Sequence, residues 1–147
     1  MSPLELLLVH AAATWALVGL IWVVQLVMYP GFARVPSPDF SAYHEHHCSR
    51  ITWVVAPLMG VELLSGIALL FDRPEPVPPA ALWVGAALIA VNWGCTGLVS
   101  VPLHGRLSAR RDPRALRALV WTNWIRTAAW TGRGALLFVL LQLALAG

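Results

Sequence analysis

Charged residues are scarce in this chain, and lysine is absent. Only 12% of the 147 residues are charged, 59% are hydrophobic, and all ten basic residues are arginine. The mean hydropathy is +0.70. A soluble domain carries about a quarter of its residues as Asp, Glu, Lys and Arg, so this composition argues against one. We therefore expect an integral membrane protein, with the lipid bilayer as its solvent.

Several motifs that indicate particular chemistry are also missing. The sequence has no glycine-rich phosphate loop, no Walker element, no dinucleotide fingerprint and no Cys-x-x-Cys pair. Its two cysteines, Cys48 and Cys95, do not have the spacing of a metal site, and we expect no disulfide between them. ATP-driven work and thiol redox chemistry are accordingly not expected.

Four apolar stretches make up most of the chain. They cover residues 4–29, 51–71, 80–103 and 121–146. Each has the roughly 20 residues that a helix needs to cross the hydrocarbon core, and little chain is left for a soluble domain. The sequence predicts one all-α domain, an antiparallel bundle of four transmembrane helices with short connections.

The arginines outside these stretches are distributed unevenly. Only Arg73 lies between the second and third stretches, whereas seven follow the first and third, namely Arg34, Arg50, Arg106, Arg110, Arg111, Arg114 and Arg117. By the positive-inside rule the arginine-rich end faces the cytoplasm, so both termini face away from it; a bacterial inner membrane is expected. Attraction to anionic lipid explains the basic loop, so no nucleic-acid partner is expected.

Two helices are expected to begin before they enter the bilayer and so to extend into the cytoplasm. The segments Ser37-Pro38-Asp39 and Asp112-Pro113 each offer a capping residue followed by a proline at the first helical position. A helix that begins at Pro38 continues into the second stretch, where Pro57 is expected to kink it.

Histidines are concentrated near the cytoplasmic end of that helix. His44 and His47 are three residues apart and share a face, which helical spacing extends to Glu62. His46 points away from them and is expected at the solvated surface. His10, in the first helix, is either a haem ligand or a hydrogen-bonded core residue, and we favour the core residue.

The last helix carries a continuous polar and aromatic face. Its members recur at steps of three or four residues and are Asn123, Arg126, Thr127, Trp130 and Arg133. A charged residue deep in a span costs about 2.5–3.5 kcal/mol unless it is paired or solvated, so this face must point inward. Glu62 is the only acid within an apolar stretch at comparable depth. We predict that it pairs with Arg133, either at a functional site or only to set the helix register.

The third helix is expected to supply the remaining wall of a polar pocket. Its inward residues are Trp93, Thr96, Gly97, Ser100 and His104. The flat ligand or cofactor that this pocket would hold is expected to contact Trp93 and Trp130, with Thr96 and Thr127 beside them.

Polar and ionisable groups from the second, third and fourth helices are predicted to meet in this pocket, which opens toward the cytoplasm. They are His44, His47, His104, Asn123, Arg126, Glu62 and Arg133, with the last two at the floor. Ionisable groups that face the interior of a membrane bundle mark functional sites. All of these residues except His44 are candidate catalytic residues, whereas His44, His47 and His104 are candidate metal ligands.

Residues 96–107, 123–127 and 29–30 carry a similarity to known proteins. They resemble the anthrone oxygenase-like family of small four-helix membrane proteins. In that family Val-Pro-Leu-Asn-x-x-Leu commonly ends helix three and Asn-x-x-Arg-Thr opens helix four. This resemblance implies an oxygenase that converts a polycyclic anthrone to a quinone without a metal. His104 stands where asparagine is more usual, which suggests a metal or a different acid–base group. A fainter similarity, through His10, is to bacterial haem-binding protoporphyrinogen oxidases.

Three functions remain open. The first is a membrane oxidoreductase, oxygenase-like, for a lipophilic substrate, with His104 or His47 as general base and Arg126 and Asn123 stabilising an oxyanion; this needs no cofactor. The second is a metal or haem protein with His44, His47 and His104 as ligands. The third is a non-enzymatic binder, transporter subunit or accessory protein whose polar residues specify packing. Small residues on several faces favour a homo-oligomer in each case.

Overall fold

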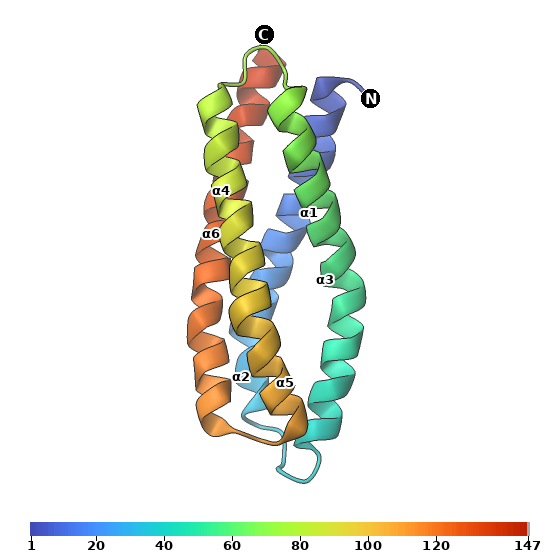
Figure 1. The fold of residues 1–147 in the computed structure, drawn as a ribbon, viewed down its shortest axis with the longest axis vertical. Helices are drawn as coiled ribbons and strands as arrows, with labels where there is room; N and C mark the ends of the chain where they lie inside the picture. The colour runs from blue at the N-terminus through green and yellow to red at the C-terminus, as the bar shows by residue number, and fades with distance from the viewer. Residues whose placement is uncertain (147) are drawn as a thin grey trace.

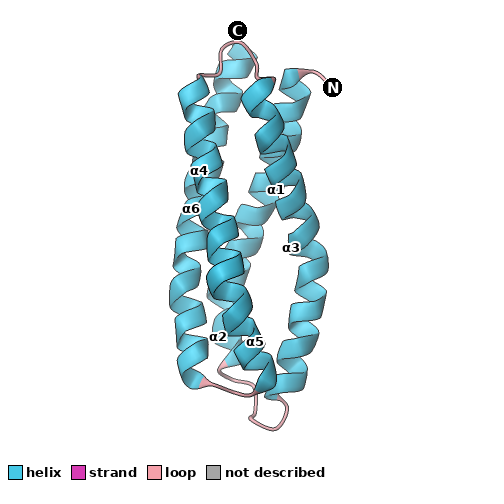
Figure 2. Ribbon diagram, viewed as in Figure 1, coloured by secondary structure: helices cyan, strands magenta, loops and turns pink. Residues whose placement is uncertain are grey.

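The chain folds into a bundle of long helices. The computed structural model describes residues 1–146, which contain helices, turns and loops but no strand (Figure 2). The elements are α1 (Pro3–Val23), η1 (Val24–Met28), α2 (Tyr29–Phe32), α3 (Phe40–Phe71), α4 (Pro79–Cys95), η2 (Thr96–Ser100), α5 (Val101–Ala109) and α6 (Pro113–Ala146). Figure 1 shows the connections at alternate ends of the bundle, with both termini at the end opposite the α2–α3 and α5–α6 loops.

These elements form four continuous helical rods, each long and apolar enough to cross a membrane. The rods are Pro3–Phe32, Phe40–Phe71, Pro79–Ala109 and Pro113–Ala146, with 30, 32, 31 and 34 residues. At about 1.5 Å per residue they are about 45–51 Å long, which exceeds the roughly 30 Å of a hydrocarbon core. The helical content confirms the predicted all-α class. Every rod is longer than the hydrocarbon core by at least one helical turn.

The two predicted helix starts have different outcomes. α6 begins at Pro113 as expected, because Asp112 Oδ1 accepts hydrogen bonds from the backbone N–H groups of Arg114 (2.9 Å) and Ala115 (3.2 Å). The predicted start at Pro38 is wrong. α3 begins at Phe40, since residues 36–39 close a separate turn in which the Asp39 N–H donates to the Pro36 carbonyl.

A π-helical turn interrupts two of the rods just before a proline. In η1 the Tyr29 N–H donates to the carbonyl of Val24, and in η2 the Val101 N–H donates to that of Thr96, five residues back in both cases. Pro30 and Pro102 come next, and a proline has no N–H for the α-helical ladder and crowds the carbonyl four residues earlier. The wider π turn relieves the missing hydrogen bond and the crowding at the proline, and it adds one residue to that turn of the helix.

The structure corrects one expectation about the third rod. Gly97 was predicted to face the interior, but it is exposed, and a Cβ built on it would meet no atom within 4 Å. Thr96 and Ser100 still face a cavity. Asn92 and Cys95 are buried, and at about 100° per residue Gly97 lies about 140° and about 200° around the helix from them, so it faces away from the interior.

Apolar packing is divided between the two ends of the bundle. The cluster at the arginine-rich end is built around Leu17, Phe32, Phe40, Leu107 and Leu119, and the cluster at the other end around Leu7, Leu69, Val77 and Leu137. The buried polar residues of α1, α3 and α6 lie between and beside these clusters, where they are shielded from water.

Candidate functional site

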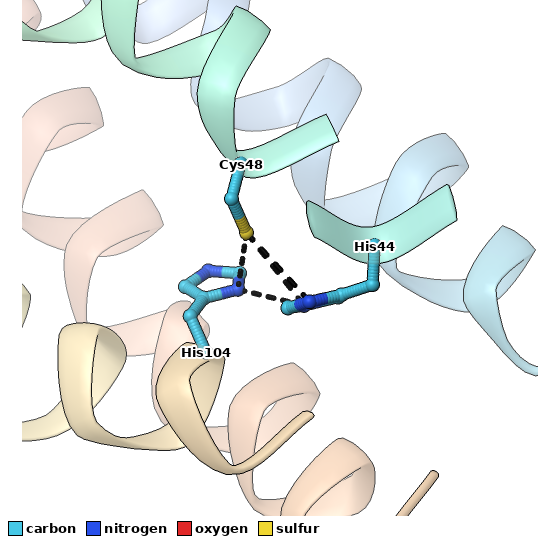
Figure 3. Close-up of side chains that lie close together, drawn as sticks. All are labelled: His44, Cys48 and His104. Carbon is cyan, nitrogen blue, oxygen red and sulfur yellow. Dashed lines mark hydrogen bonds between the residues drawn. The ribbon is translucent and has the colours of Figure 1, made fainter. Parts of the chain in front are cut away.

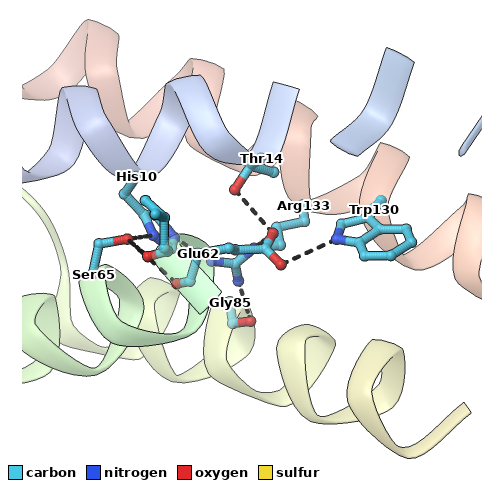
Figure 4. Close-up of polar contacts among 8 residues, drawn as sticks. His10, Thr14, Glu62, Ser65, Gly85, Trp130 and Arg133 are labelled. Carbon is cyan, nitrogen blue, oxygen red and sulfur yellow. Dashed lines mark hydrogen bonds and ion pairs between the residues drawn. The ribbon is translucent and has the colours of Figure 1, made fainter. Parts of the chain in front are cut away.

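An ion pair crosses the interior of the bundle (Figure 4). Arg133 Nε of α6 donates to Glu62 Oε1 of α3 over 2.9 Å, and the two side chains are 2% and 0% exposed. Thr14 Oγ1 of α1 donates to the same oxygen over 3.0 Å, and Trp130 Nε1 donates to Oε2 over 3.1 Å. The predicted contact between Glu62 and Arg133 is therefore present, and the Glu62 carboxylate accepts hydrogen bonds from three donors.

The rest of the Arg133 guanidinium is also partnered. One Nη contacts the backbone carbonyl of Gly85 on α4, and the other contacts His10 Nε2 on α1. A Cβ at Gly85 would lie 3.2 Å from Arg133 Nη1, so glycine lets the guanidinium approach the backbone. Residues from all four rods thus meet at one buried cation.

His10 has both ring nitrogens engaged in this network. Nε2 must accept from Arg133, so Nδ1 carries the proton and donates to Ser65 Oγ over 2.7 Å. Ser65 Oγ in turn donates to the carbonyl of Val61 over 2.5 Å. With no lone pair left for a metal, His10 matches the favoured hydrogen-bonded core residue and not the haem ligand.

A second polar chain connects α6 to η1. Asn123 Nδ2 donates to Gln25 Oε1 over 2.8 Å, and Gln25 Nε2 donates to the carbonyl of Val120. Asn123 Oδ1 accepts from Arg126 Nη1 over 3.2 Å. Thr127 Oγ1 donates to the Asn123 carbonyl, so both residues are buried and satisfied within the helix packing. Sequence reasoning missed the role of Gln25 here.

Two histidines and a cysteine converge near the arginine-rich end (Figure 3). His44 and Cys48 lie on α3, His104 lies on α5, and one ligand atom from each falls within 4.8 Å of the others. His44 Nε2 is 3.0 Å from His104 Nδ1. Cys48 Sγ is 3.5 Å from His104 Nδ1 and 3.8 Å from His44 Nε2.

These separations are close to those within a tetrahedral metal site. With metal–nitrogen bonds of about 2.0–2.1 Å and a metal–sulfur bond of about 2.3 Å, the edges of the tetrahedron are about 3.3 Å between nitrogens and about 3.6 Å between nitrogen and sulfur. The three observed distances differ from these edges by a few tenths of an ångström. Cys48 Sγ is also 3.8 Å from His44 Nδ1, so the His44 ring would have to turn for Nε2 to point at an ion shared with the thiol.

The outward nitrogens of both imidazoles also have partners. His44 Nδ1 lies 3.0 Å from Ser108 Oγ, and His104 Nε2 lies 3.1 Å from the Tyr29 hydroxyl. If each of these nitrogens donates its hydrogen, His44 Nε2 and His104 Nδ1 present lone pairs to the cluster. Metal-binding histidines are held in this way, because the outer hydrogen bond sets both tautomer and ring orientation.

Cys48 occupies the position that the sequence assigned to His47. A helix turns about 100° per residue, so Cys48 lies about 40° to one side of His44 and His47 about 60° to the other. By spacing alone, either residue could have supplied the third ligand atom. The His47 ring instead packs on Phe32, with centroids 5.0 Å apart. His46 is exposed as expected.

A cavity of about 280 Å³ lies beside this cluster. All four rods contribute to its mostly apolar wall, and the polar lining residues are Tyr29, His47, Thr52, Thr96, Ser100, His104 and Arg126. Four of its lining residues are exposed, Thr52 and Ala56 on α3 and Trp93 and Val101 on the third rod. The cavity therefore opens sideways, between α3 and the third rod.

The structure divides the predicted pocket into three places. His47, His104, Arg126, Trp93, Trp130 and Thr96 line the cavity. His44 belongs to the cluster, with His104 shared between the two. Asn123, Thr127, Glu62 and Arg133 are buried but lie outside the cavity wall, so the expectation that Glu62 and Arg133 form its floor is wrong. Trp130 links the regions, since its ring lines the cavity and its N–H reaches Glu62.

Protein-family models, curated proteins and solved structures were compared with this chain, and none of them matches it.

Proposed function

We propose that this chain is an integral membrane protein that spans the bilayer as an antiparallel four-helix bundle and binds one transition-metal ion near the cytoplasmic surface. Four sufficiently long apolar rods support the membrane assignment. The arginine-rich loops lie at the same end of the bundle as the cluster of His44, Cys48 and His104, and positive loops face the cytoplasm.

The convergence of three donor atoms from two separate rods is the observation that carries the metal proposal. Two imidazole nitrogens and one thiolate suit zinc or copper, whereas magnesium and calcium prefer oxygen ligands. Three protein ligands leave a fourth position for water or a substrate, as in catalytic zinc sites. Binding requires loss of the Cys48 thiol proton, so affinity should rise with pH.

Elemental analysis of the purified protein, followed by titration of the metal-free form with Co²⁺, tests this proposal. We expect one zinc or copper ion per chain and, with Co²⁺, a thiolate-to-metal charge-transfer band. His44→Ala should lose the ion, and Cys48→Ser should lose the charge-transfer band. Ser108→Ala should weaken metal binding by about 10–100-fold, because it removes the partner that orients the His44 ring.

His46→Ala is the matched control, because His46 lies in the same turn but is exposed. It should bind metal like the wild type. Metal content that is substoichiometric in the wild type, or that persists unchanged in a His44→Ala, Cys48→Ser double variant, would show that the cluster is not a metal site.

A membrane oxidoreductase, as implied by the resemblance to the anthrone oxygenase-like family, is a second candidate. The favouring observation is that His104 belongs both to the cluster and to the cavity wall, which would bring a bound lipophilic substrate next to a metal ligand. Oxygen uptake with an anthrone as substrate tests it. Oxygen uptake should occur with the wild-type protein and be lost in His104→Ala, which removes the group that the cluster and the cavity wall share.

A further inference from the structure

We infer that the cavity between α3 and the third rod binds a lipophilic anion, a molecule with an apolar body and one carboxylate group held by Arg126. This inference does not rest on the metal proposal. It starts from the buried positive charge of Arg126, which has no acidic residue beside it.

Arg126 is 6% exposed and lines the cavity, yet it pairs with no acid. Within residues 1–146 the one ion pair joins Glu62 and Arg133, and Glu62 is the one buried acid. The contacts of Arg126 are with neutral groups. Nη1 donates to the Asn123 side-chain oxygen, Cζ lies 5.0 Å from the Trp130 ring centroid, and the Tyr29 hydroxyl is within hydrogen-bonding reach. A cation enclosed by apolar side chains normally has a counter-charge, and none of the described acids supplies one.

The guanidinium also has hydrogen-bonding capacity to spare. Arg126 Nε is buried without a partner, and so is Ser100 Oγ on η2, a residue that is 3% exposed. Both residues line the same cavity. Buried polar atoms are rarely left unpaired, because each costs about 1–3 kcal/mol. Both atoms are covered by neighbouring groups, so each side chain would turn slightly to meet an acceptor that enters the cavity.

The remainder of the wall selects an apolar body for that ligand. Aliphatic and aromatic side chains provide most of the lining, among them Leu17, Ile21, Val55, Met59 and Trp130. The volume of about 280 Å³ is close to the lower end of small-molecule sites, about 300–1,000 Å³. The sideways opening would admit a ligand from the hydrocarbon phase. Either a medium-length acyl chain or a small aromatic ring system offers this chemistry.

Isothermal titration calorimetry of the purified protein in neutral detergent tests the inference, with empty micelles as the blank. Decanoate and 2-naphthoate represent the two sources, decanol is the neutral counterpart, and decyltrimethylammonium is the cationic one. We expect at least one of the two anions to bind at least about ten-fold more tightly than decanol, since a charge-assisted hydrogen bond is worth this factor or more. The anion that binds more tightly identifies the source.

Arg126→Gln should weaken anion binding by about 10–100-fold and leave decanol unchanged. Ser100→Ala should weaken it by a few-fold, about the effect of one neutral hydrogen bond. Arg117→Gln is the matched control, because it removes the same charge from an exposed position of α6 and should change nothing.

Equal affinity for decanol and for both anions in the wild type would overturn the inference, and so would wild-type anion affinity in Arg126→Gln. If Arg126→Gln does not fold, Arg126→Lys keeps the charge while losing the planar donor group. The inference is then judged on the wild-type protein alone. If it binds both anions less than about ten-fold more tightly than decanol, the inference is wrong.

Discussion

At the residue scale, Glu62 has the most demanding environment in the bundle. It is fully buried and accepts hydrogen bonds from Thr14, Trp130 and Arg133, which come from two other rods. Desolvation of a carboxylate and a guanidinium is costly, and their attraction repays that cost only when the geometry is good and the remaining polar atoms are satisfied. Both conditions hold here, so each partner depends on the other.

Removing one member of the pair should therefore destabilise the protein strongly. We expect Arg133→Gln and Glu62→Gln each to lower the free energy of unfolding by about 3–5 kcal/mol, because each leaves an uncompensated buried charge. The double variant should lose less than the sum of the two, by about 0.5–3 kcal/mol. Unfolding in detergent, followed by circular dichroism, measures all three.

Glu75→Gln and Arg117→Gln, at exposed positions, are the matched controls for these substitutions. They should change stability by no more than about 0.5 kcal/mol. Strictly additive effects in the double variant would mean that the 2.9 Å contact between Glu62 and Arg133 contributes no coupling energy.

At the element scale, the start of α6 depends on a charged cap. The backbone N–H groups of Ala115 and Arg114 donate to Asp112 Oδ1 and lower the pKa of that carboxyl below its ordinary value. The helix dipole acts in the same direction, since it favours a negative charge at a helix N-terminus. The cap is therefore a source of pH-dependent stability.

Because the folded pKa of Asp112 is below its unfolded value, the cap contributes fully above the unfolded pKa of about 3.9 and loses its contribution as the pH falls through the lower folded pKa. Asp112→Asn keeps a capping side chain but cannot titrate. We expect the melting temperature of the wild type to fall further than that of Asp112→Asn between about pH 6 and about pH 2. Parallel curves across this range would contradict the assignment.

The prolines show where an element can be predicted from sequence and where it cannot. Pro30 and Pro102 each follow a π turn, whereas α3 continues through Pro57 as one helix. A proline reveals that one ladder bond is missing, but not whether the turn widens to accommodate it. That choice depends on packing against neighbouring rods.

At the scale of the whole molecule, the arginine-rich loops are tied to one another. Arg111, which follows α5, donates to Ser37 Oγ and to the Ala33 carbonyl, both over 2.9 Å, and its guanidinium lies 5.9 Å from the Phe40 ring centroid. These contacts hold the two loops together at one end of the bundle, opposite the termini (Figure 1). We expect this charge asymmetry to set the orientation of the bundle in a bilayer.

Cysteine labelling in intact cells tests this orientation. In a Cys48→Ser, Cys95→Ser background, Glu75→Cys should react with a membrane-impermeant maleimide, because the α3–α4 loop is expected outside the cytoplasm. Ala109→Cys should react only after the cells are permeabilised. The background without a new cysteine is the control, and the reverse labelling pattern would mean that the arginine-rich end faces outward.

Helix number, helix type and the inward face of α6 were all predictable from the sequence, because they depend on apolar length and on spacing of three or four residues. The partner of Arg133 was predictable too, since Glu62 is the one acid available at that depth. The third atom of the cluster, Cys48 Sγ, could not be predicted from the sequence. Cys48 and His47 are adjacent and both lie near the His44 face, and the choice between them depends on how α5 packs against α3. Spacing along one helix sets directions, whereas distances between helices come from packing.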